Sequence, residues 1–277
     1  MARLKKVGIF SLTSCEGCQL QILDLEKRLL DLLDFIEIDY FKLAEERSRM
    51  EYFDIAFVEG AVSTIHEREK LETVRKNSKY LVAIGACACH GGIPSLRNLI
   101  KTTGGRGYHP ISSSKTVAIN KFVKVDYYLR GCPIEKEEFA SFLLMLLRGK
   151  VPLEVNSPVC GECNNREIEC LLRKGIPCLG PITASGCNAV CPEHSTPCEG
   201  CRGTIEDANI FSLVDSLKSL GLPERDIENK LHKFASSLLI GKGRSSRPFR
   251  GKGNYSPVDC RKRGASLDWG KKKCNLL

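Results

Sequence analysis

Cysteine is the residue whose number and spacing decide which chemistry this chain can perform. The sequence of 277 residues holds 15 cysteines, and the first two form a CxxC motif, Cys15 and Cys18, where an apolar run gives way to a helical pattern. One such motif suits a redox dithiol, half of a zinc site or part of a larger metal centre. In the cytoplasm, thiols are kept reduced, so metal binding is the expected role for so many cysteines.

A second group of cysteines is dense and poor in apolar neighbours. Eight of them fall within 42 positions, from Cys160 to Cys201, and bound metal is expected to hold such a segment together. Two CxxC pairs here suit a zinc site, which leaves four cysteines for a second, irregular one. Cys187 and Cys191, followed by Pro192, match the C-x3-C-P end of ferredoxin-type sequences. The spacing favours iron–sulfur clusters and leaves zinc open.

The elements that must position these thiols follow from hydrophobic periodicity. In the first 150 residues, strand signals alternate with helix signals. The expected strands cover residues 6–12, 36–41, 54–60 and 80–88, and the expected helices cover residues 20–33, 65–76 and 135–149. Alternation of this kind predicts a parallel sheet covered on both faces, an α/β fold of the flavodoxin-like, doubly wound type.

Binding sites in such sheets form at the carboxyl ends of the strands. Cys15 and Cys18 follow the first expected strand, Cys87 and Cys89 follow the run YLVAIG, and Cys132 stands just before the last helix. Cysteines more than a hundred positions apart are therefore expected to meet at one edge of the sheet.

The sequence divides into four segments. We expect a flavodoxin-like domain, an irregular iron–sulfur domain with short helices, a helical segment and a basic, flexible tail, over residues 1–150, 151–203, 204–239 and 240–277. In the helical segment, Thr204 is the expected N-cap of one helix and Pro223 opens a second. The tail cysteines, Cys260 and Cys274, are expected to be free thiols.

Charge is concentrated in the tail. Residues 240–277 hold eleven Lys or Arg and two Asp, and so carry a net charge of +9. This equals the formal net charge of the whole chain. A neutral body is a poor match for nucleic-acid binding. The basic tail is expected to be a solvated extension. The alternative is that it forms an arm that covers an acidic partner subunit. The N-terminus lacks an export signal and no apolar run reaches the about 20 residues that span a bilayer, so a cytoplasmic protein is expected.

Five cysteine-bearing motifs occur in one order along the chain. They are SCEGCQLQIL, GACACHGG, GCPIEKEE, CLGP and PCEGC. This order resembles the small, electron-transferring subunit of [NiFe] hydrogenases, in the cytoplasmic group of sulfhydrogenases, NADP-linked enzymes and F420- or viologen-reducing enzymes. The resemblance covers residues 5 to about 203 and leaves the two following helices and the tail unaddressed.

The resemblance implies three [4Fe–4S] clusters. The implied proximal ligands are Cys15, Cys18, Cys87 and Cys132. The implied distal ligands are Cys160, Cys163, Cys170 and Cys178. The implied medial ligands are Cys187, Cys191, Cys198 and Cys201. Cys87 matches the family motif, and Cys89 stays open as a substitute. The glycines expected to bring backbone amides close to cluster sulfurs are Gly17, Gly91, Gly92 and Gly131.

The implied function is that of an electron relay within a hydrogenase complex, an oxidoreductase acting on H2. A separate large subunit would hold the nickel–iron centre, since the paired CxxC motifs of that subunit have no counterpart here, and this chain alone is not expected to activate hydrogen. The implied acceptor is a flavoprotein, a diaphorase or a heterodisulfide reductase-type partner.

Two alternatives to that relay stay open. One is an interaction module stabilised by zinc without a redox role. The other is an electron carrier of a hydrogenase-like complex that lacks the nickel site, although such relatives carry an adjacent Cys-Cys pair where this chain has CEGC. Glu16 and His90 lie beside expected ligands, and each suits either a proton relay or a purely local role, as a helix-start acid or a donor to a cluster sulfur.

Overall fold

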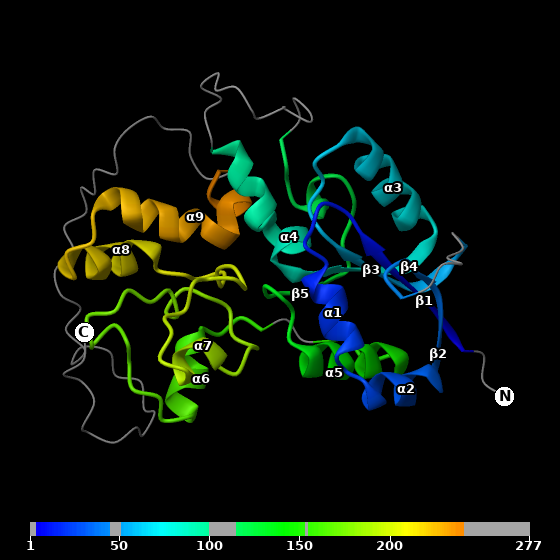
Figure 1. The fold of residues 1–277 in the computed structure, drawn as a ribbon, viewed down its shortest axis with the longest axis horizontal. Helices are drawn as coiled ribbons and strands as arrows, with labels where there is room; N and C mark the ends of the chain where they lie inside the picture. The colour runs from blue at the N-terminus through cyan, green and yellow to red at the C-terminus, as the bar shows by residue number, and fades with distance from the viewer. Residues whose placement is uncertain (1–3, 45–50, 100–114, 153–154, 241–277) are drawn as a thin grey trace, which may run out of the picture. The chain divides into compact units, whose positions relative to one another are not determined.

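The central element is a parallel sheet with the strand order β2-β1-β3-β4-β5 (Figure 1). The structure is a computed structural model that describes residues 4–44, 51–99, 115–152 and 155–240. The strands of the sheet are β1 Lys5–Ser11, β2 Ile36–Phe41, β3 Phe53–Glu59, β4 Ser78–Ile84 and β5 Tyr127–Leu129. Every neighbouring pair is parallel, and this order is that of a flavodoxin-like, doubly wound sheet. The predicted fold class is confirmed.

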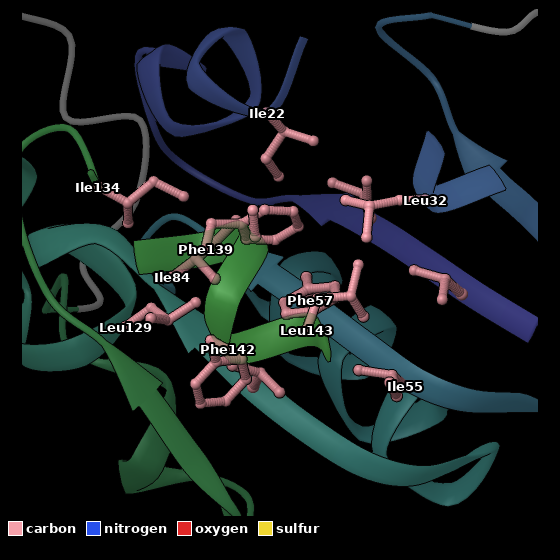
Figure 2. Packing of buried hydrophobic residues seen from close by; sticks show 14 of the residues in the cluster. Ile22, Leu32, Ile55, Phe57, Ile84, Leu129, Ile134, Phe139, Phe142 and Leu143 are labelled. Carbon is pink, nitrogen blue, oxygen red and sulfur yellow. The ribbon is translucent and has the colours of Figure 1, made fainter. Parts of the chain in front are cut away.

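Alternation along the strands divides the core into two layers. Ile9, Phe57 and Val82 point to one face of the sheet, and their neighbours Phe10 and Val58 point to the other. Figure 2 shows the first layer, where strand side chains pack against side chains from three helices. Because both faces are buried, the strands read as continuous apolar runs.

Helices cover both faces of the sheet. On the first face lie α1 Gly17–Leu23, α2 Lys27–Leu33 and α5 Lys136–Leu147 (Figure 1). On the other lie α3 Ile65–Lys76, α4 Gly85–His90 and the 3-10 turn η2 Ile119–Lys121, while a further 3-10 turn, η1 Ile93–Asn98, follows α4. A capping box starts α3, in which the hydroxyl of Thr64 accepts from the backbone of Glu67 and the Glu67 carboxylate accepts from the backbone of Thr64.

Two predicted elements of the sheet domain differ from the structure, and one strand was not predicted. The helix expected over residues 20–33 is two helices, because Glu26 adopts a left-handed φ of 49° between them. The strand expected to continue to residue 88 ends at Ile84, because Gly85 has a φ of +81° and starts α4. The short strand β5 was not predicted, since three residues carry too little periodicity to be recognised.

The cysteine-rich region holds short helices between irregular segments. They are α6 Val159–Asn165 and α7 Val190–Glu193, and they precede α8 Ile210–Ser219 and α9 Glu224–Ile240. The predicted N-cap Thr204 is wrong. Asn209 caps α8 by accepting from the Ser212 amide at 3.0 Å, whereas Thr204 forms a β-bridge with Thr183.

Contacts between Cα atoms divide the chain into the units Met1–Gly243 and Arg244–Leu277. The finer boundaries at residues 150, 203 and 239 stay predictions. The predicted flexible tail, with Cys260 and Cys274, lies almost wholly outside the described residues. In the described part of the chain, none of the helices is both long and apolar enough to cross a bilayer.

Candidate metal centres

Four cysteines meet at the carboxyl edge of the sheet. Cys15 and Cys18 follow β1, Cys87 lies on α4 after β4, and Cys132 follows β5. Burial is the main cause that raises the pKa of the Cys87 thiol to about 12, and the neighbouring thiols of Cys132 and Cys15 act in the same direction. Burial also raises the pKa of Cys18, followed by the charges of Glu59, Cys87 and Cys132. The structure therefore brings the four predicted proximal residues together.

Cys89 lies apart from this group. Its thiol donates to the backbone carbonyls of Ala83 at 3.6 Å and Leu129 at 3.5 Å, within the core between α4 and the sheet. Residues two apart on a helix do not face the same side, so Cys87 and Cys89 point in different directions. Of the two cysteines that the sequence left open, Cys87 is the one beside the other three.

Two of the predicted glycines lie against thiols. A Cβ at Gly17 would lie 3.4 Å from the sulfur of Cys15, and one at Gly92 would lie 3.0 Å from the sulfur of Cys87. A methyl group at either place would occupy space next to the sulfur that a bound group needs.

The other two predicted glycines shape the loops rather than touch sulfur. Gly91 ends α4 with a φ of 96°, and the carbonyl of Gly131 accepts from the Ala86 amide at 2.6 Å.

Three residues around the proximal group were not identified from the sequence. Glu59, at the end of β3, is 2% exposed, and its carboxylate accepts from the Cys18 amide at 3.2 Å and from Gln19 Nε2 at 3.0 Å. Burial raises the pKa of Glu59, and the Gln19 amide opposes that shift. A Cβ on Gly85 would overlap the Cys18 sulfur. An acidic residue at the carboxyl end of a buried strand, on the same edge as a CxxC motif, was the available signal for Glu59.

The predicted distal cysteines also group together. Burial raises the pKa of Cys160 to about 12, and the thiols of Cys178, Cys163 and Cys170 act in the same direction. Gly180, another residue that sequence reasoning missed, lies between two of these sulfurs. A Cβ there would be 3.3 Å from the sulfur of Cys160 and 3.5 Å from that of Cys178.

The predicted medial cysteines form the third group. Burial is the main cause that raises the pKa of Cys201 to about 11, and the thiols of Cys187 and Cys191 act in the same direction. Burial likewise raises the pKa of Cys198 to about 12, with a contribution from Cys201. Cys178, from the predicted distal set, also raises the pKa of Cys198 and of Cys191, so these two sets adjoin. The division of the eight cysteines into two quartets stays a prediction.

Two backbone contacts link the predicted medial cysteines to the other two sets. The backbone of Cys132, from the proximal set, lowers the pKa of the Cys201 thiol against the effect of burial. The Cys198 amide, from the medial group, donates to the sulfur of Cys178 in the distal group at 3.2 Å. The predicted medial cysteines therefore adjoin both other sets, and the labels medial and distal stay predictions.

Two of the predicted sets reach the protein surface. Cys15 and Cys132 of the proximal group are exposed, as is Cys170 of the distal group. The medial cysteines are buried or half-buried. The predicted proximal and distal sets therefore each include an exposed cysteine.

Glu162 connects the distal motif to the medial one. It lies between Cys160 and Cys163 on α6, yet its carboxylate accepts from the amides of Gly186 at 2.7 Å and Ala189 at 3.1 Å. After burial, Glu162 is the next cause of the raised pKa of Cys187. No local pattern in the sequence indicated this contact.

The two polar residues singled out for a relay have defined surroundings. The Glu16 carboxylate accepts from the Ser11 hydroxyl at 3.2 Å. His90 is 3% exposed, and its ring lies against Gly203. Burial lowers the pKa of His90 to about 4, and Arg130 contributes in the same direction, so the ring is neutral at pH 7. A relay role for either residue stays a prediction.

The donor sets fit iron–sulfur clusters. Each group supplies four thiols, which is the ligand number of a [4Fe–4S] cluster. Burial disfavours thiolates, so they need a bound cation, and the irons of a cluster supply that charge. Among the described residues, no three His, Cys, Asp or Glu side chains converge on one metal-ion position. A cluster separates its four thiolates more widely than a single ion does.

Several known proteins are similar to this chain in sequence. Residues 15–146 match the family described as NADH ubiquinone oxidoreductase, 20 Kd subunit. Sulfhydrogenase 2 subunit delta of Pyrococcus furiosus is 41% identical over 83% of this chain and 99% of that protein. A vhu subunit of the F420-non-reducing hydrogenase of Methanocaldococcus jannaschii is 32% identical over 73% of this chain and 82% of that one.

A solved structure, NAD+-reducing [NiFe]-hydrogenase in the H2-reduced state, contains a chain that is 31% identical. The match extends over 55% of this chain and 95% of the chain in that structure, with a TM-score of 0.49. The identity to the Pyrococcus protein extends over nearly its entire length. This chain therefore belongs to the family of hydrogenase small subunits that includes the sulfhydrogenase delta chain and its counterpart in the F420-non-reducing hydrogenases.

Proposed function

We propose that this chain is the iron–sulfur electron-transfer subunit of a cytoplasmic [NiFe] hydrogenase. The observation that supports the proposal is that the predicted medial cysteines adjoin both other sets, with the Cys132 backbone beside Cys201 and the Cys198 amide donating to the sulfur of Cys178. The proposed partners are a large subunit that oxidises H2 to protons and electrons, and a further redox subunit of the flavoprotein, diaphorase or heterodisulfide reductase type. Clusters held by these cysteines would supply one-electron transfer.

The chain's own residues bind, orient and shield this relay. The twelve proposed ligands are Cys15, Cys18, Cys87, Cys132, Cys160, Cys163, Cys170, Cys178, Cys187, Cys191, Cys198 and Cys201. Exposed Cys15 and Cys132 put the proximal site within reach of the large subunit, and exposed Cys170 does the same at the distal end for the acceptor. Amides that donate to sulfur favour the more negative, reduced state and so raise the potential.

The proposal is tested on the full chain purified under strict anoxia. We expect about twelve iron and about twelve acid-labile sulfide atoms per chain, from three [4Fe–4S] clusters. We also expect a brown colour whose broad visible absorption bleaches on reduction. A colourless preparation with stoichiometric zinc would contradict the relay and support the zinc-stabilised module.

The Glu162→Gln substitution is expected to raise the reduction potential of the medial cluster. The change removes a negative charge beside Cys187 and weakens two charge-assisted hydrogen bonds to the 186–189 loop. An EPR-monitored redox titration measures the shift. Exposed Glu167, shortly after α6, provides the matched control Glu167→Gln. Equal shifts in both variants would show that the contact with the loop has no special effect.

A further inference from the structure

Arg202 is a buried cation between two of the proposed cluster sites. It directly follows Cys201 in the sequence and is 3% exposed. Its Nε donates to the carbonyl of Ser185 at 2.7 Å, and its Nη1 donates to the carbonyl of Arg130 at 2.7 Å. Nη1 and Nη2 also donate to the two carboxylate oxygens of Glu138, at 2.8 and 2.7 Å. This is the bidentate geometry that makes arginine pairs with carboxylates strong and directional.

These hydrogen bonds tie together the loops that carry proposed ligands of two different clusters. Arg130 lies two residues before Cys132 of the proximal group, and Ser185 lies two residues before Cys187 of the medial group. The guanidinium of Arg202 holds the backbone of both loops at once, and α5 anchors it through Glu138. One side chain therefore contacts the backbone next to both sites.

The neighbouring backbone leaves space for the ion pair. Gly186, next to Cys187, has a φ of +109°. A Cβ there would lie 2.9 Å from Cζ of Arg202 and 2.9 Å from Oε1 of Glu138. Position 186 thus requires glycine for two reasons, its backbone conformation and the side chains that pass over it.

The ion pair also sets the local charge. The side chains of Arg202 and Glu138 are 4% and 23% exposed, so solvent screens them weakly. Arg202 lowers the pKa of the Cys187 thiol, against burial and Glu162, which raise it. Its field therefore reaches a proposed medial ligand. With both partners present, the charges compensate each other, and loss of one leaves the other buried without compensation.

On the basis of the proposed function, we propose that Arg202 and Glu138 are positioning residues of the electron relay. Their ion pair fixes the spacing of the proximal and medial sites and balances the charge between them. Charge near an iron–sulfur cluster changes its reduction potential, because the reduced cluster is the more negative state. Removal of Arg202 and removal of Glu138 are therefore expected to shift the reduction potential in opposite directions, although the two residues belong to the same ion pair.

The test measures the midpoint potential of the medial cluster in the full chain by EPR-monitored redox titration. The medial signal is identified as the one altered by Cys191→Ser. Arg202→Met leaves an uncompensated carboxylate, so the potential is expected to fall. Glu138→Gln leaves an uncompensated guanidinium, so the potential is expected to rise. The double variant restores neutrality and is expected to return close to the wild-type value.

Glu137→Gln is the matched control, because Glu137 is the preceding residue on α5 and pairs with Arg28 at the exposed surface. No shift is expected there. Shifts of the same sign for Arg202→Met and Glu138→Gln, or no shift in either, would overturn the inference and leave a purely structural contact. If Arg202→Met loses its iron, Arg202→Lys, which keeps the charge, is expected to stay near the wild-type potential while Glu138→Gln rises. Absence of iron and sulfide in the wild-type chain would contradict the proposed function itself.

Discussion

Cys87→Ser is expected to remove the proximal cluster, whereas Cys89→Ser is expected to leave it in place. In the first variant, iron falls from about twelve to about eight atoms per chain, since one of three four-iron clusters is lost. Hydrogen-dependent electron output falls at least about 100-fold, because changes beside a metal ligand already cost 10–100-fold and this change removes the ligand itself.

The physical reason for the contrast is the direction of each thiol. The pKa of Cys87 is raised by burial and then by the thiols of Cys132 and Cys15, which places it among the other proposed ligands. The thiol of Cys89 donates to the carbonyls of Ala83 and Leu129 on the sheet side of α4. A serine hydroxyl at position 89 can donate its one proton to either of these carbonyls, so little is lost.

The measurement is iron content together with hydrogen-dependent reduction of a viologen dye by the complex with its partner subunits. The two variants differ at positions two residues apart on the same helix, so each serves as the control of the other. Iron loss in Cys89→Ser with full occupancy in Cys87→Ser would reverse the assignment. Full occupancy in both variants would show that each cysteine replaces the other.

Local patterns in the sequence predicted the fold where the periodicity was strong. The expected strand over residues 36–41 and helix over residues 65–76 match β2 and α3 at both ends. Buried apolar runs identify strands of a parallel sheet, and a capping residue such as Thr64 marks a helix start. The grouping of thiols at the strand ends followed from topology, because parallel strands bring their carboxyl ends to one edge.

The remaining features depend on contacts between distant residues. Arg202 pairs with Glu138, which lies 64 positions away, and Glu162 binds the backbone of Gly186, which lies 24 positions away. A single sequence gives the charge of each residue but not its partner, so these interactions were not predicted. The irregular path between the cysteines has no period, and bound metal rather than apolar burial is the expected source of its stability.

Glycine at position 85 has a role that becomes visible only when the Cys18 thiol is placed beside it. Gly85 directly follows β4 and has a φ of +81°, and a Cβ there would overlap the Cys18 sulfur. Gly221, between α8 and α9, has a φ of +85°, and no atom lies within 4 Å of the place that a Cβ there would occupy. The two glycines therefore impose the same backbone strain on an alanine but differ in the space around it.

Gly85→Ala is expected to displace Cys18 and lower the iron content from about twelve to about eight atoms per chain, through loss of the proximal cluster. The free energy of unfolding is expected to fall by about 1 kcal/mol from backbone strain, as in Gly221→Ala, plus about 1–3 kcal/mol from overpacking. Iron analysis and thermal denaturation of the two variants, compared under anoxia, separate these contributions. Since Gly221→Ala carries the strain alone, it is expected to keep all of its iron. Equal iron content in the two variants would mean that the start of α1 moves aside at little cost, and that its close packing against Gly85 does not hold the Cys18 thiol in place.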